Sequence, residues 1–140
     1  MTLDLLLIVR TARRRYAVRR TDVAEIRLVA DTSTMPRDER GQPYIGVELG
    51  PLLDPDDRSD LARRRALVVP LRRRKVALLA DLVESFHEHA QVVALPELFS
   101  ARLSQPWAIG VLLLGDEVIV QLDVRAVARS ALARGAGDSV

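Results

Sequence analysis

The sequence predicts an all-β fold: a small β-barrel module, mainly β with short helices, that ends in a C-terminal helix. Two apolar hairpins in the second half of the chain indicate this class. The first is Ala66–Val83, which turns at Arg72–Arg74. The second is Ala108–Leu122, whose Gly115-Asp116 turn is a strong hairpin signal. Apolar residues at helical spacing follow Asp123, and many short strands with one terminal helix are typical of a barrel architecture.

The first half of the chain is predicted to contain short strands joined by polar turns. Leu3–Arg10 carries apolar residues on both faces of an extended chain, which predicts a strand covered on both sides. Asp22 can cap a brief helical turn over Thr21–Glu25. The other elements predicted here are a charged turn at Arg13–Arg15, strands at Tyr16–Arg19, Ile26–Ala30 and Tyr44–Leu49, a polar loop at Asp31–Pro43 and a turn at Gly50-Pro51.

The second half supplies the longer elements. Pro70, in the strand that opens the first hairpin, favours a sheet edge or a bulge because proline cannot donate to a β-ladder. The returning strand is predicted over Val76–Val83. Asp123 is expected to cap the terminal helix and Gly135 to follow its last residue, so that residues 135–140 fray.

The composition is that of one domain over residues 1–140. Hydrophobic residues make up 49% of the chain, enough for a sizeable core, and the absence of cysteine excludes disulfides and thiolate metal sites. No signal-peptide pattern occurs at the N-terminus, and no apolar run reaches the roughly 20 residues that span a bilayer. We therefore expect a soluble, cytoplasmic protein that does not insert into a membrane.

Few residues suggest catalysis. His87 and His89 lie two apart on an extended segment and could reach one metal ion, but they are the only histidines, and zinc needs a third ligand. We interpret them as solvent-facing strand residues, which leaves a metal-dependent enzyme as the least favoured hypothesis. Asp81, in an apolar strand, is expected to be a structural anchor held by an arginine or by backbone amides. No second positioned group accompanies it, so we expect no enzyme, no metal and no cofactor.

Three arginine clusters raise nucleic-acid binding as the alternative function. They are Arg13–Arg15, Arg63–Arg65 and Arg72–Arg74. The net charge is only +2 and aromatic residues make up 4% of the chain, so stacking platforms for bases are scarce. A basic β-barrel that binds nucleic acid is thus less favoured than a module that binds proteins.

Several segments occur in an order that is similar to one known family. They are Leu6–Val9 with Arg15–Val18, Asp22–Ile26, Tyr44–Val47, Lys75–Val83, and Ile109–Val111 with Val120–Asp123. In this order they resemble the opening hairpin, the helical V-x-E-V turn, the Gly-Val strand, the G-L-L-V-D-x-V strand and the closing hairpin of the CheW-like domain. That domain of bacterial chemotaxis occurs in the adaptor CheW and in the regulatory domain of the histidine kinase CheA.

The resemblance covers about residues 3 to 130 and implies two small SH3-like β-barrels that share one core. It also implies a non-catalytic adaptor that couples chemoreceptors to a CheA-like histidine kinase through protein contacts. The chain departs from the family pattern at Glu48–Asp54, which stands in place of an N-L-R-G turn and a returning strand. The residues that the resemblance marks as protein contacts are Val23, Glu25, Ile26, Tyr44, Gly46, Val47, Leu79 and Val83.

Overall fold

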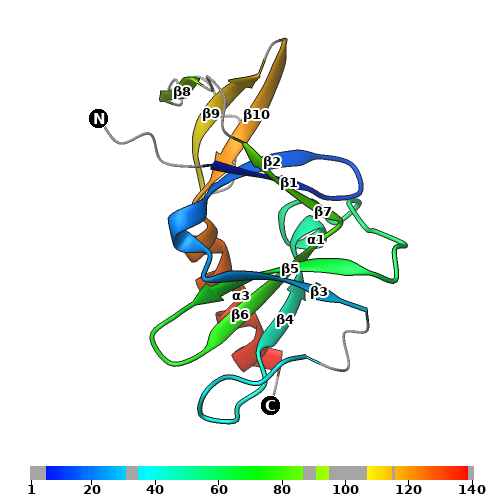
Figure 1. Ribbon diagram of the computed structural model, residues 1–140, viewed down its shortest axis with the longest axis vertical. Helices are drawn as coiled ribbons and strands as arrows, with labels where there is room; N and C mark the ends of the chain where they lie inside the picture. Colours follow the sequence, from blue (N-terminus) through cyan, green and yellow to red (C-terminus); the bar gives the residue numbers. More distant parts are fainter. Residues whose placement is uncertain (1–5, 31–34, 87–90, 95–106, 115, 139–140) are drawn as a thin grey trace.

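The computed structural model describes residues 6–30, 35–86, 91–94, 107–114 and 116–138. Over these residues the protein is mainly β, which confirms the predicted fold class (Figure 1). The strands are β1 (Leu6–Arg10), β2 (Arg15–Arg19), β3 (Glu25–Val29), β4 (Ile45–Glu48), β5 (Arg64–Pro70), β6 (Lys75–Ala80), β7 (Leu82–Phe86), β8 (Gln91–Ala94), β9 (Ala108–Leu114) and β10 (Glu117–Leu122). The helices are the short 3-10 helix η1 (Arg20–Asp22) and the α-helices α1 (Leu49–Leu53) and α3 (Val124–Asp138).

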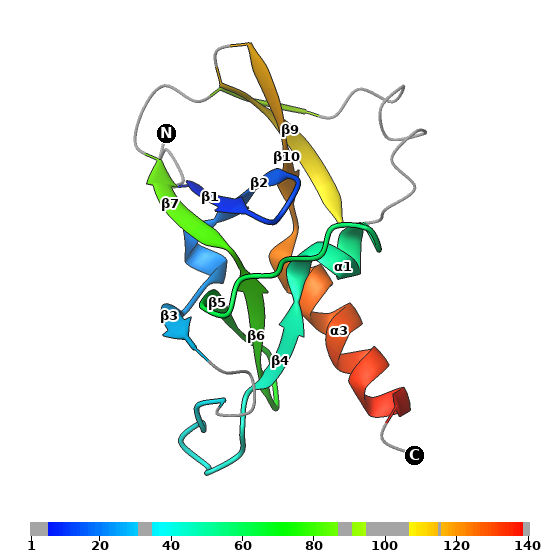
Figure 2. The same cartoon turned by 90° about the vertical axis from the view of Figure 1, so that its right-hand side faces the viewer.

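The strands form two sheets. The larger has the order β7-β1-β2-β10-β9-β8 and the smaller the order β3-β5-β6-β4. The two sheets lie one above the other, and α3 runs beside the smaller one (Figure 2). Within the described ranges neither sheet closes on itself, so the two predicted barrels correspond to two open sheets that are consistent with SH3-like units.

Both predicted hairpins are confirmed, but the first one ends earlier than expected. β5 pairs with β6 and β9 pairs with β10, each antiparallel. β6 stops at Ala80, and after the single residue Asp81 the chain continues as β7 in the other sheet. The prediction of one strand over Val76–Val83 is therefore wrong. The apolar pattern runs without a break through both strands, because each of them is packed against the core.

Pro70 lies in a central strand and not in an edge strand. Pairing between β5 and β3 ends at Val68, however, so only β6 lies beside the chain at Pro70. The N–H that proline lacks is therefore not needed for a bond to β3. The prediction of an edge strand is therefore wrong for β5 as a whole, but at Pro70 itself the strand has a neighbour on one side, as proline requires.

A short helix, α1, stands where the sequence predicted the end of a strand and a turn. Pro51 falls in its first turn, where the missing N–H removes no hydrogen bond. Gly50 lies against the backbone of Asp57 so closely that a Cβ at this position would overlap the Asp57 carbonyl oxygen. The glycine thus allows the loop that contains Asp57 to pack on the helix.

The main core lies between the two sheets and the two α-helices. β1 contributes to it with Leu7 and Val9, whereas Leu6 and Ile8 on the opposite face belong to a separate buried cluster. All four side chains are buried, which confirms that this strand is covered on both sides. The fully or nearly buried residues of the main core are Leu7, Val9, Tyr16, Val18, Leu49, Leu53, Leu67, Val69, Val76, Leu78, Ala80, Leu122, Val124, Val127, Ala128 and Ala131.

The terminal helix begins where the sequence predicted. The Ala126 N–H donates to Asp123 Oδ1 at 3.2 Å, which confirms Asp123 as the N-cap. The helix continues through Gly135 to Asp138, so the prediction that it ends before Gly135 is wrong. A glycine in a helix costs only about 1 kcal/mol and does not force the helix to end. In the described parts of the chain no helix is long and apolar enough to cross a membrane.

Candidate protein-binding site

The expected contact residues lie mainly on the two outer strands of the smaller sheet. Glu25 and Ile26 begin β3, and Gly46 and Val47 are in β4, at the opposite edge. Successive residues of a strand face opposite sides of the sheet. The predicted residues are therefore divided between an outer face of the smaller sheet and the face that covers the main core.

On the outer face, Tyr44 connects the two edges of the sheet. Its hydroxyl donates a hydrogen bond to Glu25 Oε1 at 3.0 Å, and the same oxygen lies 3.0 Å from Arg27 Nε. Lys75 Nζ lies 5.7 Å from the centroid of the Tyr44 ring, within the range of a cation–π interaction. Burial, and then the hydrogen bond to Glu25, raise the pKa of Tyr44 above its ordinary value. The phenol therefore stays protonated and holds Glu25 in place.

Beneath Tyr44 lies a small cluster that includes Leu79. This side chain is 2% exposed and packs with Val68 and Ala77 of the central strands. A partner that docks on this face would meet Tyr44 and its neighbours before it met Leu79. Because the Leu79 side chain is buried, it offers a partner no surface to contact, and we leave it out of the proposed surface.

Gly46 is exposed and faces the same cluster. A Cβ placed on it would come within 2.6 Å of Met35 Cε, so any larger residue would have to displace the end of this flexible side chain. The glycine therefore lets Met35 cover the outer face of the smaller sheet. Its role in the structure is close packing with Met35.

Val23, Val47 and Val83 lie at the margin of the main core. Each is half-buried and packs against core residues. Val83, in β7, pairs with Val9 in the larger sheet. These three side chains do not adjoin Tyr44 and Glu25 in one patch, although the sequence grouped them.

The apolar side chains that are most available on this sheet are Ile26 and Leu28. They are 44% and 53% exposed, two positions apart on β3, and thus share one face of the strand. Among the described residues β3 pairs only with β5, so its other backbone edge is an outer edge of the sheet there. We call Ile26 and Leu28 the β3 apolar pair. The sequence argument missed Leu28, although its i, i+2 spacing from Ile26 within a predicted strand was a usable signal.

Asp81 is confirmed as a structural anchor. Its Oδ1 lies 3.4 Å from Arg64 Nη1, and its backbone N–H donates to the carbonyl of Arg10. Arg64, which is 7% exposed, also donates to Glu48 Oε1 at 2.9 Å and to the carbonyls of Ser59 and Leu61. Arg64, the central residue of the Arg63–Arg65 cluster, is therefore buried and bonded within the protein, and it is not part of a solvated basic patch.

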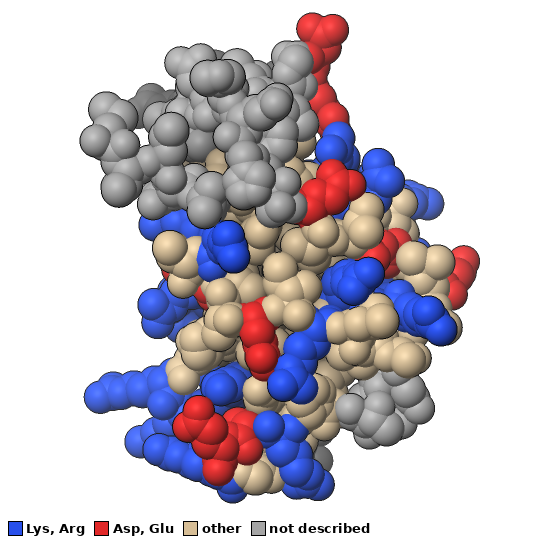
Figure 3. All heavy atoms as spheres, in the orientation of Figure 1, with Lys and Arg blue, Asp and Glu red and all other residues tan. Residues whose placement is uncertain are grey.

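The predicted metal candidates cannot be placed. His87 and His89 lie outside the described residues. In the ranges that the structure does describe, no group of three or more His, Asp or Glu side chains is arranged to hold a metal ion. Figure 3 shows basic and acidic side chains intermixed on the described part of one face, where no broad field of one sign develops.

Comparison with known proteins identifies one family. The model of the CheW-like domain matches residues 5–132 of the chain. The fold is similar to the crystal structure of the scaffolding protein TtCheW from Thermoanaerobacter tengcongensis. The TM-score is 0.66 and the sequence identity 15%, with 87% of this chain and 90% of that chain covered. No curated protein sequence matches the chain.

Proposed function

The chain belongs to the CheW-like domain family, and from this premise we propose that it is a cytoplasmic, non-catalytic adaptor of a chemotaxis-like two-component system. In this role it couples chemoreceptors to a CheA-like histidine kinase through protein–protein contacts. The observation that carries the proposal is the family match over residues 5–132, which spans both sheets.

The β3 apolar pair is the centre of the proposed kinase contact. Exposed aliphatic side chains on an edge strand offer a partner both a hydrophobic contact and an unpaired backbone edge. Glu25, fixed by the Tyr44 hydroxyl, supplies a positioned carboxylate on the opposite face of the same strand. Gly46, Val23, Val47 and Val83 are secondary contact residues. A stable complex on this scale buries about 1,000 to 2,000 Å² in total.

Binding of this chain to the regulatory domain of the histidine kinase from the same organism tests the proposal by isothermal titration calorimetry. Ile26→Asp places a charge at the centre of the contact and is expected to weaken binding by about tenfold or more. Leu61→Asp is the matched control, because Leu61 is 54% exposed but lies in the loop before β5. It is expected to bind as the unaltered chain does.

One result would contradict the adaptor function, and another would contradict the placement of the contact on β3. One is the absence of a complex at protein concentrations on the order of tens of micromolar. The other is equal weakening by both aspartate variants, which would show that the β3 apolar pair has no special role. A gel shift with duplex DNA at two salt concentrations tests the alternative, because nucleic-acid binding weakens steeply as salt increases.

A further inference from the structure

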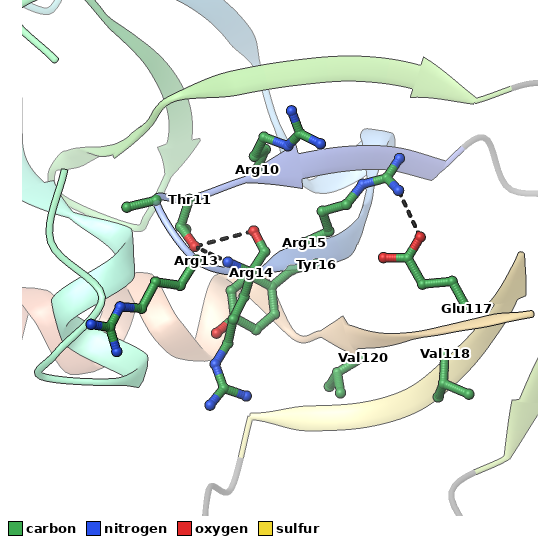
Figure 4. A pocket seen from close by; sticks show the side chains of 10 residues that line it. Arg10, Thr11, Arg13, Arg14, Arg15, Tyr16, Glu117, Val118 and Val120 are labelled. Carbon is green, nitrogen blue, oxygen red and sulfur yellow. Dashed lines mark hydrogen bonds and ion pairs between the residues drawn. The ribbon is translucent and has the colours of Figure 1, made fainter.

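A hollow opens in the larger sheet where two neighbouring strands separate. β2 and β10 run parallel and pair only at Val120 with Tyr16 and at Gln121 with Ala17. Earlier in β10, residues 117–119 pair with β9 alone. The gap between the β1–β2 turn and this part of β10 has a volume of about 470 Å³ (Figure 4).

Positive charge dominates the lining of this hollow. Arg10, Arg13, Arg14 and Arg15 line it, against the single carboxylate of Glu117. Arg15 Nη1 lies 2.7 Å from Glu117 Oε2, and Arg14 Nη2 lies 3.5 Å from an oxygen of Asp54. Arg13 is exposed, and no carboxylate of the described residues forms an ion pair with it. The Arg14 side chain is 61% exposed, and its contact with Asp54 is an exposed ion pair that contributes little. Arg10 is exposed as well, but it shares a face of β1 with Leu6 and Ile8, and its side chain points away from β10 (Figure 4). The guanidinium groups of Arg13 and Arg14 are therefore the ones available to an anionic ligand.

Hydrogen bonds to a buried carboxylate fix the turn that carries these arginines. Asp57 is 1% exposed and accepts hydrogen bonds from the Thr11 hydroxyl and from the Arg13 backbone N–H, the latter at 2.9 Å. The Thr11 N–H donates to the Arg14 carbonyl and closes the turn. A turn fixed in this way presents its arginines with little conformational entropy left to lose on binding.

The opposite side of the hollow is apolar. Val118, on β10, is 59% exposed, and Val120 beside it is half-buried. In Figure 4 the Arg14 and Tyr16 side chains extend from the hairpin toward the gap, with Val118 and Val120 on the β10 side. An aliphatic side chain of a ligand can pack on Val118 while carboxylates on either side of it reach the arginines.

We propose that this hollow binds an acidic segment of a partner protein, in which carboxylates meet Arg13 and Arg14 and an aliphatic side chain packs on Val118. The surface lies on the larger sheet, apart from the β3 apolar pair, so the proposal does not depend on the adaptor function. A nucleic acid fits the site less well. The Tyr16 ring, which is the aromatic group that lines the hollow, is too deeply buried to stack on bases.

Fluorescence anisotropy with a rhodamine-labelled peptide, Glu-Glu-Leu-Glu-Glu, tests the proposal on the full chain. The double variant Arg13→Gln with Arg14→Gln is expected to bind this peptide about tenfold or more weakly than the unaltered chain, since two charge-assisted contacts are lost. Val118→Thr is expected to weaken binding of the same peptide by about threefold and to leave binding of an all-glutamate peptide unchanged.

The matched control is the double variant Arg72→Gln with Arg73→Gln. These arginines are exposed in the β5–β6 turn, and their replacement removes the same charge from the other sheet. The control is expected to bind the acidic peptide as the unaltered chain does, and a Gln-Gln-Leu-Gln-Gln peptide is expected not to bind.

Three outcomes would overturn the proposal. Absence of binding to the acidic peptide would show that the hollow is not a site for acidic segments. Equal losses in the two double variants would show attraction to net charge alone. Tighter binding of a single-stranded oligonucleotide than of the acidic peptide, lost in the Arg13 and Arg14 variant, would assign the hollow to nucleic acid instead. Circular dichroism of both double variants confirms that the comparison is made between folded proteins.

Discussion

Both tyrosines of the chain are buried phenols whose protonated form is favoured by the fold. Burial raises the pKa of Tyr16 to about 12. Burial and the hydrogen bond to Glu25 raise the pKa of Tyr44 in the same direction. A phenolate formed at either position would have to exist in an apolar cluster or beside a carboxylate. At the scale of single residues, the fold is therefore sensitive to alkaline conditions at both tyrosines.

We expect the free energy of unfolding to decrease as the pH rises from about 10 to about 12. The pKa of Tyr16 is near 10 in the unfolded chain and about 12 in the folded one. Its contribution is fully present below pH 10 and is lost as the pH rises through the folded value, by about 2 kcal/mol in total. Urea unfolding at several alkaline pH values measures this decrease.

Tyr16→Phe removes the ionisable group and keeps the ring, so its stability should decrease less over the same pH range. The ultraviolet absorbance of the phenolate provides a separate measurement, because this variant retains Tyr44 as its one tyrosine. An equal decrease in stability in the variant and the unaltered chain would contradict the assignment to Tyr16.

Single-residue roles were predictable where they depend on near neighbours in the sequence. Asp123 was identified as an N-cap from its position before an apolar helical pattern. Asp81 was expected to need an arginine, but the sequence could not identify Arg64 as that arginine, since seventeen positions separate them. The burial of Leu79 and the bond between Tyr44 and Glu25 depend on how strands are ordered in the smaller sheet, and alternation along one strand carries no information about that order.

At the scale of elements, α3 covers one side of the smaller sheet and supplies Val124, Val127, Ala128 and Ala131 to the main core. Its first turn is satisfied by the Asp123 carboxylate, and the Asp123 N–H donates to the Trp107 carbonyl. One residue thus links the start of the helix to the start of the last hairpin. Packing of these four residues and the cap at Asp123 both stabilise the N-terminal part of the helix against fraying.

Asp123→Ala is expected to lower the free energy of unfolding by about 1 kcal/mol, because the Ala126 N–H loses its acceptor. Asp123→Asn keeps an acceptor oxygen and should restore most of this stability. Asp116→Ala is the matched control, since it removes the same charge from an exposed turn. Thermal unfolding followed by circular dichroism distinguishes the three variants, and an equal loss in Asp116→Ala would contradict the capping role.

The elements themselves were predictable to different degrees. The hairpins and the terminal helix are visible in the sequence because periodicity of two or 3.6 residues is a local property. Helix α1 was not, because Gly50 and Pro51 are typical turn residues and the helix depends on packing against the loop around Asp57. The division at Asp81 was not visible either, because strands in different sheets can share one continuous apolar pattern.

At the scale of the whole molecule, Arg64 joins parts of the chain that belong to different layers. Its guanidinium group contacts Glu48 at the end of β4 and Asp81 at the passage from the smaller to the larger sheet. It also donates hydrogen bonds to two backbone carbonyls of the loop before β5. The arginine is buried, so removing it would leave the Asp81 carboxylate, which is 13% exposed, without a cation.

Arg64→Met is therefore expected to lower the free energy of unfolding by about 3 kcal/mol, the usual effect of breaking a buried ion pair from one side. Arg65→Met is the control, because Arg65 is the exposed neighbour on the same strand and should change stability by less than about 0.5 kcal/mol. Adding Asp81→Leu to Arg64→Met should recover part of the loss. Urea denaturation measures all three, and similar losses in Arg64→Met and Arg65→Met would show that burial of the pair is unimportant.

The change from one sheet to the other at Asp81 also determines whether the protein can be separated into independent layers. The chain begins in the larger sheet, builds the smaller one from β3 to β6, and then returns to complete the first with β7 to β10. The smaller sheet is therefore contiguous in the chain, whereas the larger sheet is divided by it, and α3 follows only after the last strand of the larger sheet. A segment that carries the smaller sheet alone lacks the helix that covers it and exposes the core residues that α3 buries, so we expect neither layer to fold without the other.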